Sequence, residues 1–165
     1  MLKASDICPV ISAECERWLK SIGYYEKPAS LKYHGAETGG LFRHSLALVS
    51  FLQYMTDRLG LTWEREESPA VVGLFHDVCK CDDYVLEAGV WVSNKNKKDG
   101  HGEKSILMLK DHIKLTQEET ACIQYHMGAF TNKEEWQYYT QAVQTYSNVL
   151  FTHTADMVAS QILGA

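Results

Sequence analysis

The chain has 165 residues, of which 45% are hydrophobic and 22% are charged, and its formal net charge at pH 7 is −5. This length and composition predict a single globular domain over residues 1–165, large enough to bury a core. The negative charge argues against a broad basic surface, so duplex nucleic acid is not an expected partner.

The cysteines are odd in number and lack CxxC spacing, in a chain without a recognisable signal peptide: Cys8, Cys15, Cys79, Cys81 and Cys122. This pattern predicts free thiols and a cytoplasmic location. Cys79 and Cys81 fit either buried structural thiols or soft metal ligands. Apolar runs stay shorter than the ~20 residues that span a bilayer, so no membrane partner is expected.

The first forty residues predict one packing helix and one irregular segment. Residues 5–22 place apolar side chains at helical spacing after Ser5, a possible N-cap, and Gly23 follows the last of them. Residues 23–40 are rich in glycine, and His34 lies there shortly before the next helix. Glycines allow close approach of a ligand, so His34 is either a phosphate contact or a surface histidine.

Two apolar helices are predicted next, and each carries a histidine. Residues 41–59 form a helix whose apolar stripe includes His44, which is either a hydrogen-bonded core histidine or a ligand. Residues 69–80 form a buried helix that ends with His76 and Asp77. Burial of this pair is costly unless the two residues share a core hydrogen bond or hold a divalent cation together.

A small β-hairpin near 84–92 is predicted from its β-prone residues, and a basic loop follows with Lys95, Lys97 and Lys98. The loop is either a solvated charge run or an electrostatic funnel for a phosphorylated substrate.

Helices fill the remainder of the predicted fold. One runs from about 100 to 112 and carries His101 and Lys104 near its start. Thr116 and Glu119 form a capping box for a helix that ends near His126. The last two helices are predicted over the following residues: 133–145 and 147–162, the second with Asp156 inside an apolar stretch.

Six polar residues therefore recur on predicted apolar faces or helix ends: His44, His76, Asp77, His101, His126 and Asp156. Helical bundles commonly hold metals between such side chains. We expect these six to converge, whereas His112 looks exposed and His153 is left out of the set.

The order of these residues resembles that of the HD superfamily of metal-dependent phosphohydrolases, whose signature is His, then His-Asp, then a distant Asp. The match is carried by residues 39–46, 76–80 and 154–157, and Gly39-Gly40 is similar to HD domains attached to some 3′-to-5′ exoribonucleases. The resemblance implies an all-α, HD-domain-like helical bundle, with the hairpin as a minor addition.

The resemblance also implies a ligand set. His44, His76, Asp77 and Asp156 would hold a first metal, while His101 and His126 resemble the extra histidines of binuclear members, with Asp77 as the bridge. One or two divalent ions per chain are expected, and mixed imidazole and carboxylate ligation suits Mn²⁺, Fe²⁺, Co²⁺, Ni²⁺ or Zn²⁺. Val78-Cys79 departs from the aliphatic residue and glycine that often precede the lysine matched by Lys80.

The expected activity is hydrolysis of a phosphomonoester or phosphodiester in a small nucleotide-type substrate by metal-activated water. Asp77, Lys80 and His34 are the predicted catalytic residues, and His34, Lys80 and Lys104 the predicted substrate contacts. One alternative is a nuclease-like phosphodiesterase on single-stranded RNA or oligonucleotides, suggested by the basic loop and Trp91. The other alternative is a regulatory module without catalytic activity, which binds nucleotides and keeps a metal for its structure.

Overall fold

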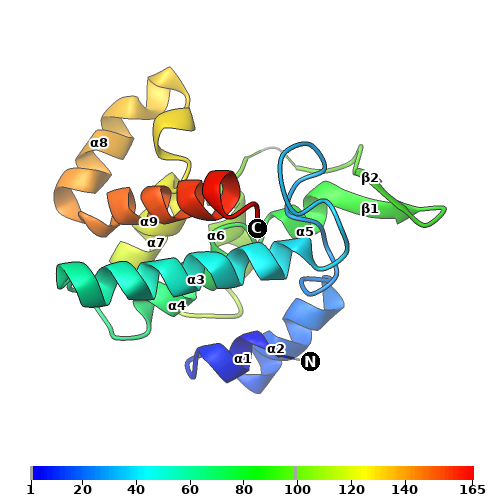
Figure 1. Cartoon of the computed structure of the whole chain (residues 1–165), viewed down its shortest axis with the longest axis horizontal. Coiled ribbons are helices and arrows are strands. Elements are labelled where there is room, and N and C mark those ends of the chain that lie inside the picture. Colours follow the sequence, from blue (N-terminus) through cyan, green and yellow to red (C-terminus); the bar gives the residue numbers. More distant parts are fainter. Residues whose placement is uncertain (1, 99) are drawn as a thin grey trace.

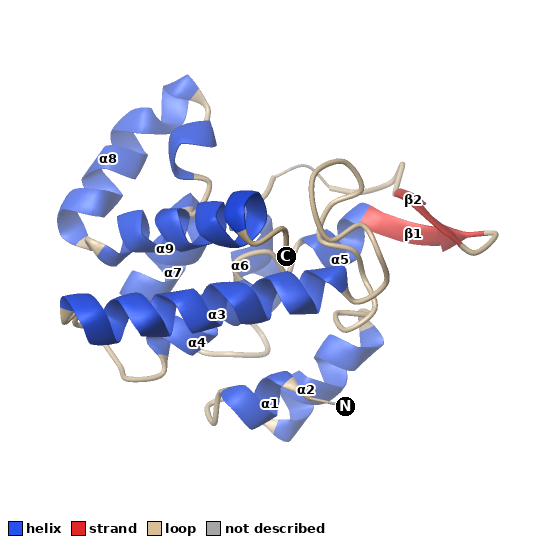
Figure 2. Cartoon of the chain, in the orientation of Figure 1, coloured by secondary structure: helices blue, strands red, loops and turns tan. Residues whose placement is uncertain are grey.

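The computed structural model describes residues 2–98 and 100–165 and shows a helical bundle with one small hairpin (Figures 1 and 2). The predicted all-α fold class with a minor hairpin is confirmed. The elements are α1 (Ala4–Ile7), α2 (Ala13–Ser21), α3 (Gly40–Leu59), α4 (Ser68–Phe75), α5 (Lys80–Asp83), β1 (Tyr84–Glu87), β2 (Val90–Ser93), α6 (Gly102–Leu109), α7 (Gln117–Tyr125), the 3₁₀ turns η1 (Gly128–Phe130) and η2 (Lys133–Glu135), α8 (Trp136–Thr145), α9 (Asn148–Met157) and the π-helical η3 (Val158–Ile162).

The prediction of one helix over 5–22 is wrong, because the chain breaks between α1 and α2. Pro9 lacks an N–H and disfavours a helical conformation in the residue before it, and Cys8 is extended (φ −127°, ψ 108°). A new helix then begins after Ser12, whose hydroxyl accepts the amide of Cys15 at 3.1 Å.

The long helix α3 forms the spine of the bundle and packs against α4 and α9 (Figure 1). Its contact with α4 depends on Gly73, because a Cβ added there would lie 2.6 Å from Val49 Cγ2 and 2.8 Å from Val49 N. Only glycine permits this backbone approach. The close contact brings the residues after α4 to the side of α3 that carries His44.

The predicted helix over 69–80 is also wrong in its extent, since α4 ends at Phe75 and α5 begins at Lys80. Between them, the hydroxyl of Ser105 donates to the carbonyl of His76 at 2.9 Å and accepts the amide of Cys79 at 3.2 Å. A side chain of α6 thus satisfies backbone groups in the turn, and the His76-Asp77 pair lies in that turn rather than within a helix.

The buried apolar residues form two clusters, and α3 contributes to both. One includes Leu19, Leu41 and Phe75 under α1 and α2, and the other joins α3 to α7 and α9. All five cysteines are buried and free. Both clusters include residues of α3, the helix that carries His44, and of α4, the helix that precedes His76.

The strands β1 and β2 pair antiparallel and project away from the helices (Figure 2). The indole N–H of Trp91 donates to the hydroxyl of Thr38 at 3.0 Å, and the ammonium of Lys27 lies 5.3 Å from the Trp91 ring centroid. These contacts anchor the hairpin to the loop before α3. Across 2–98 and 100–165, no helix has the length and apolar character needed to cross a membrane.

Candidate metal centre

Five separate segments meet at one point inside the bundle. They are the second turn of α3, the turn after α4, the N-cap of α6, the end of α7 and the last turn of α9. These segments bring together all six residues that the sequence singled out: His44, His76, Asp77, His101, His126 and Asp156.

The Asp77 carboxylate lies at the centre of the group. Its Oδ1 is 2.8 Å from Nε2 of His101 and 3.5 Å from Nε2 of His126. Its Oδ2 is 3.6 Å from Nε2 of His76 and 3.9 Å from Nε2 of His44. One carboxylate therefore contacts four imidazoles, with a different oxygen facing each pair.

Asp156 completes one side of the group. Its Oδ1 lies 3.1 Å from Nε2 of His44, which in turn lies 3.1 Å from Nε2 of His76. The site thus has two halves that share Asp77: one holds His44 and Asp156 on α3 and α9, and the other holds His101 and His126 beside α6 and α7.

Backbone carbonyls fix which ring nitrogen faces the site in three of the four histidines. A carbonyl oxygen only accepts, so the Nδ1 atom beside it must carry the proton, and Nε2 of the neutral ring then presents a lone pair. The three donor and acceptor pairs are His44 Nδ1 with the Ala165 main-chain oxygen at 3.1 Å, His76 Nδ1 with Gly73 at 3.0 Å and His126 Nδ1 with Ile123 at 2.7 Å.

These ring nitrogens and carboxylate oxygens face one another across the site. Among the described residues, Asp77 Oδ1 and His126 Nε2 are buried and lack a hydrogen-bond partner. Buried groups of this kind are costly unless a cation lies between them. Imidazole nitrogen and carboxylate oxygen together suit a divalent transition metal, so the residues fit the predicted cofactor.

Ligand atoms lie close enough to share an ion in two groups: His44, His76 and Asp77, and Asp77, Cys79 and His101, each within 4.8 Å. The second group includes Cys79, whose sulfur is 3.4 Å from His101 Nδ1. The sequence left the role of Cys79 open, while Cys81 lies in the apolar core. His101 thus meets a thiol where the other three histidines meet a carbonyl.

The electrostatic environment favours positive charge at the site. Burial lowers the pKa of His76 to about 4, so this ring is neutral at pH 7. Burial also lowers the pKa of His44, but the hydrogen bond to Asp156 and the charge of Asp77 outweigh it and raise that pKa. Burial would raise the pKa of Asp77, yet Lys80 and the imidazoles hold it well below its usual range. The carboxylates that attract a proton to His44 would attract a metal ion in the same way.

His34 lies at this site, with its ring centroid 4.8 Å from that of His44. Both of its ring nitrogens are buried and have no hydrogen-bond partner among the described residues. Burial and the neighbouring His44 lower the pKa of His34. Lys80 is half-buried beside Asp77, whose charge helps to raise the lysine pKa against the effect of burial.

Lys104 is not brought to the group. Its ammonium lies 2.7 Å from Asp82 Oδ2 and 3.0 Å from Asp83 Oδ1, and it donates to the Lys98 carbonyl. It therefore joins α6 to the end of α5, and its predicted role as a substrate contact stays a prediction.

His112 is less exposed than expected, and no position was predicted for His153. His112 is half-buried and stacks on Trp18 at a centroid distance of 4.0 Å. His153 contacts the carbonyl of His126 through Nδ1 at 2.9 Å, and its ring fills the space where a Cβ at Gly128 would lie. The sequence did offer a sign that His153 lies near the site. It precedes Asp156 by three residues, so both residues lie on the same side of α9.

The comparisons with known proteins agree with this geometry. The HD domain family matches residues 41–158, a segment that contains all six converging residues. Comparisons with curated proteins and with solved structures found no match. Members of the HD domain family are generally metal-dependent hydrolases. Because the match covers most of the chain, this protein belongs to the HD domain family.

Proposed function

We propose that this protein hydrolyses a phosphate ester of a nucleotide-type substrate in a metal-dependent reaction. The observation that carries the proposal is the set of imidazoles whose Nδ1 atoms lie against main-chain oxygens, which turns their Nε2 atoms toward the Asp77 carboxylate. Such a site offers imidazole and carboxylate donors to a cation.

The two halves of the site would hold the metal as follows. His44, His76, Asp77 and Asp156 form the ligand set for one divalent ion, and Asp77, His101 and His126 form the set for a second. When bound there, a divalent ion supplies water of lowered pKa and polarises a phosphoryl oxygen. The identity of the metal follows from availability and geometry, since the donors suit several.

His34 and Lys80 would bind the phosphate. Each His34 ring nitrogen is free of a protein partner among the described residues, so the N–H is available to a phosphoryl oxygen. Lys80 is half-buried, and its charge helps to hold the pKa of Asp77 low. Such a positive charge would offset the negative charge that develops on phosphorus oxygens. The proposed substrate contacts therefore come from the loop before α3 and from the start of α5.

The test is turnover by protein reconstituted separately with Mn²⁺, Fe²⁺, Co²⁺, Ni²⁺ or Zn²⁺. Nucleoside 5′- and 3′-monophosphates, bis-(p-nitrophenyl) phosphate and a short single-stranded RNA serve as substrates, with products separated by chromatography. We expect ester cleavage that stops on chelation and returns with metal. Metal binding and nucleotide binding without cleavage of any ester would instead support the regulatory module.

The RNA in this panel tests the nuclease alternative. In the structure, Lys27 lies over the Trp91 ring, and Lys97 lies 4.0 Å from Asp83 Oδ2. Trp91 and Lys97, two of the residues that suggested strand binding, therefore make contacts within the chain, so we give priority to mononucleotides. Cleavage of RNA in preference to mononucleotides would reverse this order.

A further inference from the structure

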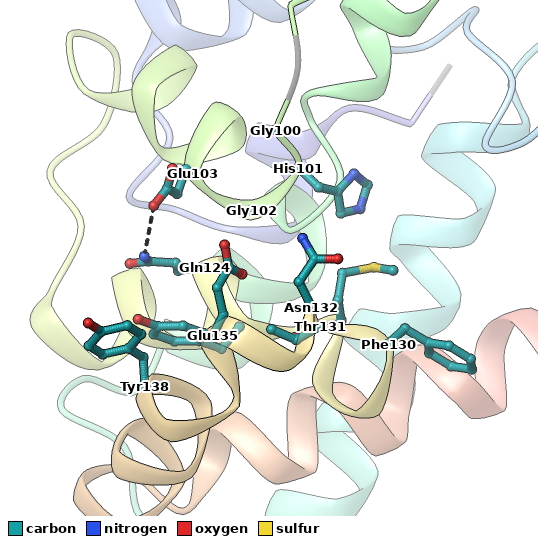
Figure 3. Close-up of a pocket in the computed structure, with 12 residues that line it drawn as sticks. Gly100, His101, Gly102, Glu103, Gln124, Phe130, Thr131, Asn132, Glu135 and Tyr138 are labelled. Carbon is teal, nitrogen blue, oxygen red and sulfur yellow. Dashed lines mark hydrogen bonds between the residues drawn. The ribbon is translucent and has the colours of Figure 1, made fainter.

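A pocket of about 400 Å³ opens beside His101, between the start of α6 and the segment 130–138 (Figure 3). A volume of this size is typical of a site for a small molecule. His101 lines the pocket while its Nε2 lies 2.8 Å from Asp77 Oδ1. The pocket therefore adjoins the metal centre directly.

The end of α7 links the pocket to the same half of the centre. Tyr125 and Met127, on either side of His126 in the chain, both line the pocket. A substrate whose phosphorus lies at the metal centre can thus extend one substituent past His101 and His126 into this space.

The pocket offers flat apolar surface to such a substituent. Tyr125, Phe130 and Tyr138 line it, and Phe130 and Tyr138 are 65% and 53% exposed. Aromatic rings next to a pocket stack well on planar heterocycles, and every nucleobase has such a face. Asn132 and Gln124 add amide groups, which can donate and accept hydrogen bonds at a base edge.

The charge in the pocket is negative. Glu103 and Glu135 line it on opposite sides, as Figure 3 shows, and the described lining residues include neither lysine nor arginine. Carboxylates accept hydrogen bonds from hydroxyl and amino groups, whereas they repel a phosphate. The favoured occupant therefore donates hydrogen bonds and carries no negative charge.

We propose that this pocket receives the leaving group and that the leaving group is a nucleoside without a further phosphate. This inference rests on the proposed function and narrows its substrate class to nucleoside monophosphates. In the reaction, the oxygen of water bonds to phosphorus and the ester P–O bond breaks. The nucleoside leaves as an alcohol with a proton from that water, and inorganic phosphate remains.

Longer substrates fit the pocket poorly for the same reason. An oligonucleotide carries a second phosphate on its leaving group, and so does a nucleoside 3′,5′-bisphosphate. Either group would place that phosphate near Glu103 or Glu135. Discrimination should therefore depend on charge in the pocket rather than on the base or sugar.

The kinetic test compares hydrolysis of a nucleoside 5′-monophosphate with that of the corresponding 3′,5′-bisphosphate, which differ only in the second phosphate. We expect kcat/KM to favour the monophosphate by about tenfold or more, and Glu135→Lys to reduce that preference to about threefold or less. The matched control is Glu134→Lys, which makes the same charge change one residue away at a position that does not line the pocket. An equal preference in wild type and Glu135→Lys would overturn the inference.

A binding test gives a second readout that does not need turnover. Saturation-transfer NMR on the full chain with the free nucleoside should show contact that is lost in Tyr138→Ala, a change at an exposed side chain. Nucleoside binding that survives Tyr138→Ala would place it elsewhere and overturn the inference. If no ester is cleaved by any metal form, the proposed function fails, and this measurement alone decides which ligand the pocket takes.

Discussion

Asp77→Asn separates the contribution of the metal from the contribution of the fold. The Asp77 carboxylate lies 2.8–3.9 Å from the Nε2 atoms of four imidazoles, so its charge is shared by both halves of the site. In the metal-free protein, Lys80 and the imidazoles hold the Asp77 pKa well below its usual range, so the ionised carboxylate stabilises the fold at pH 7. We therefore expect the metal-free variant to be less stable than metal-free wild type.

The difference in stability should grow when metal is added. At a free metal concentration of about 100 Kd, binding stabilises the wild type by about 2.7 kcal/mol. For a chain of this length, that corresponds to a rise in Tm of roughly 5–11 °C. The variant should show a rise of less than about 2 °C at the same concentration, because its affinity is too low for saturation.

Thermal unfolding followed by circular dichroism, with chelator and then with metal, measures both quantities. The matched control is Asp83→Asn, which removes a buried carboxylate that pairs with Lys104 outside the ligand set. This variant should lose stability with chelator present and keep the full rise with metal. The reasoning is refuted if Asp77→Asn keeps the wild-type rise, or if Asp83→Asn loses it to the same extent.

Three other substitutions test the surroundings of the site. Gly73→Ala should lower the free energy of unfolding by about 1–2 kcal/mol, because overpacking against α3 costs more than the gain in helix propensity. The metal content measured by elemental analysis should also fall, because α4 moves. Arg65→Met leaves the fully buried Glu119 carboxylate without its two 2.7 Å bonds, so denaturant unfolding should show a loss of about 3 kcal/mol, partly recovered by Glu119→Gln. Cys79→Ala should weaken metal binding by about tenfold in titrations, because its sulfur orients one site imidazole, whereas Cys81→Ala should leave it unchanged.

Most helices could be predicted from the sequence because their apolar residues recur at helical spacing. The capping box at Thr116 and Glu119 placed the start of α7 correctly, with both reciprocal bonds present. The break at Pro9 was missed because the apolar spacing continues across it, although a proline inside a helix removes a hydrogen bond. Hydrophobic spacing alone does not reveal such interruptions, and turn chemistry must be weighed against it.

The convergence of the six polar residues could be anticipated, but two features of the site could not. The contact between Cys79 and His101 joins residues from the turn after α4 and the cap of α6, so it depends on tertiary packing that no local pattern encodes. The separation of Lys104 from the site depends on Asp82 and Asp83, which offer a closer partner at the end of α5. Residue type and spacing identify candidate site residues, but the ion-pair partners available in the folded chain determine where each side chain lies.

The ends of two helices explain how the bundle prepares its ligands. His76 follows the last residue of α4 and His126 follows the last residue of α7, and each donates Nδ1–H to a carbonyl three residues earlier. In a continuing helix, the Gly73 carbonyl would instead accept the amide of Asp77. Because the helix stops, that carbonyl is free to hold the imidazole with Nε2 turned toward the site. The interruption that made the predicted helix over 69–80 wrong is therefore the feature that orients His76 as a ligand.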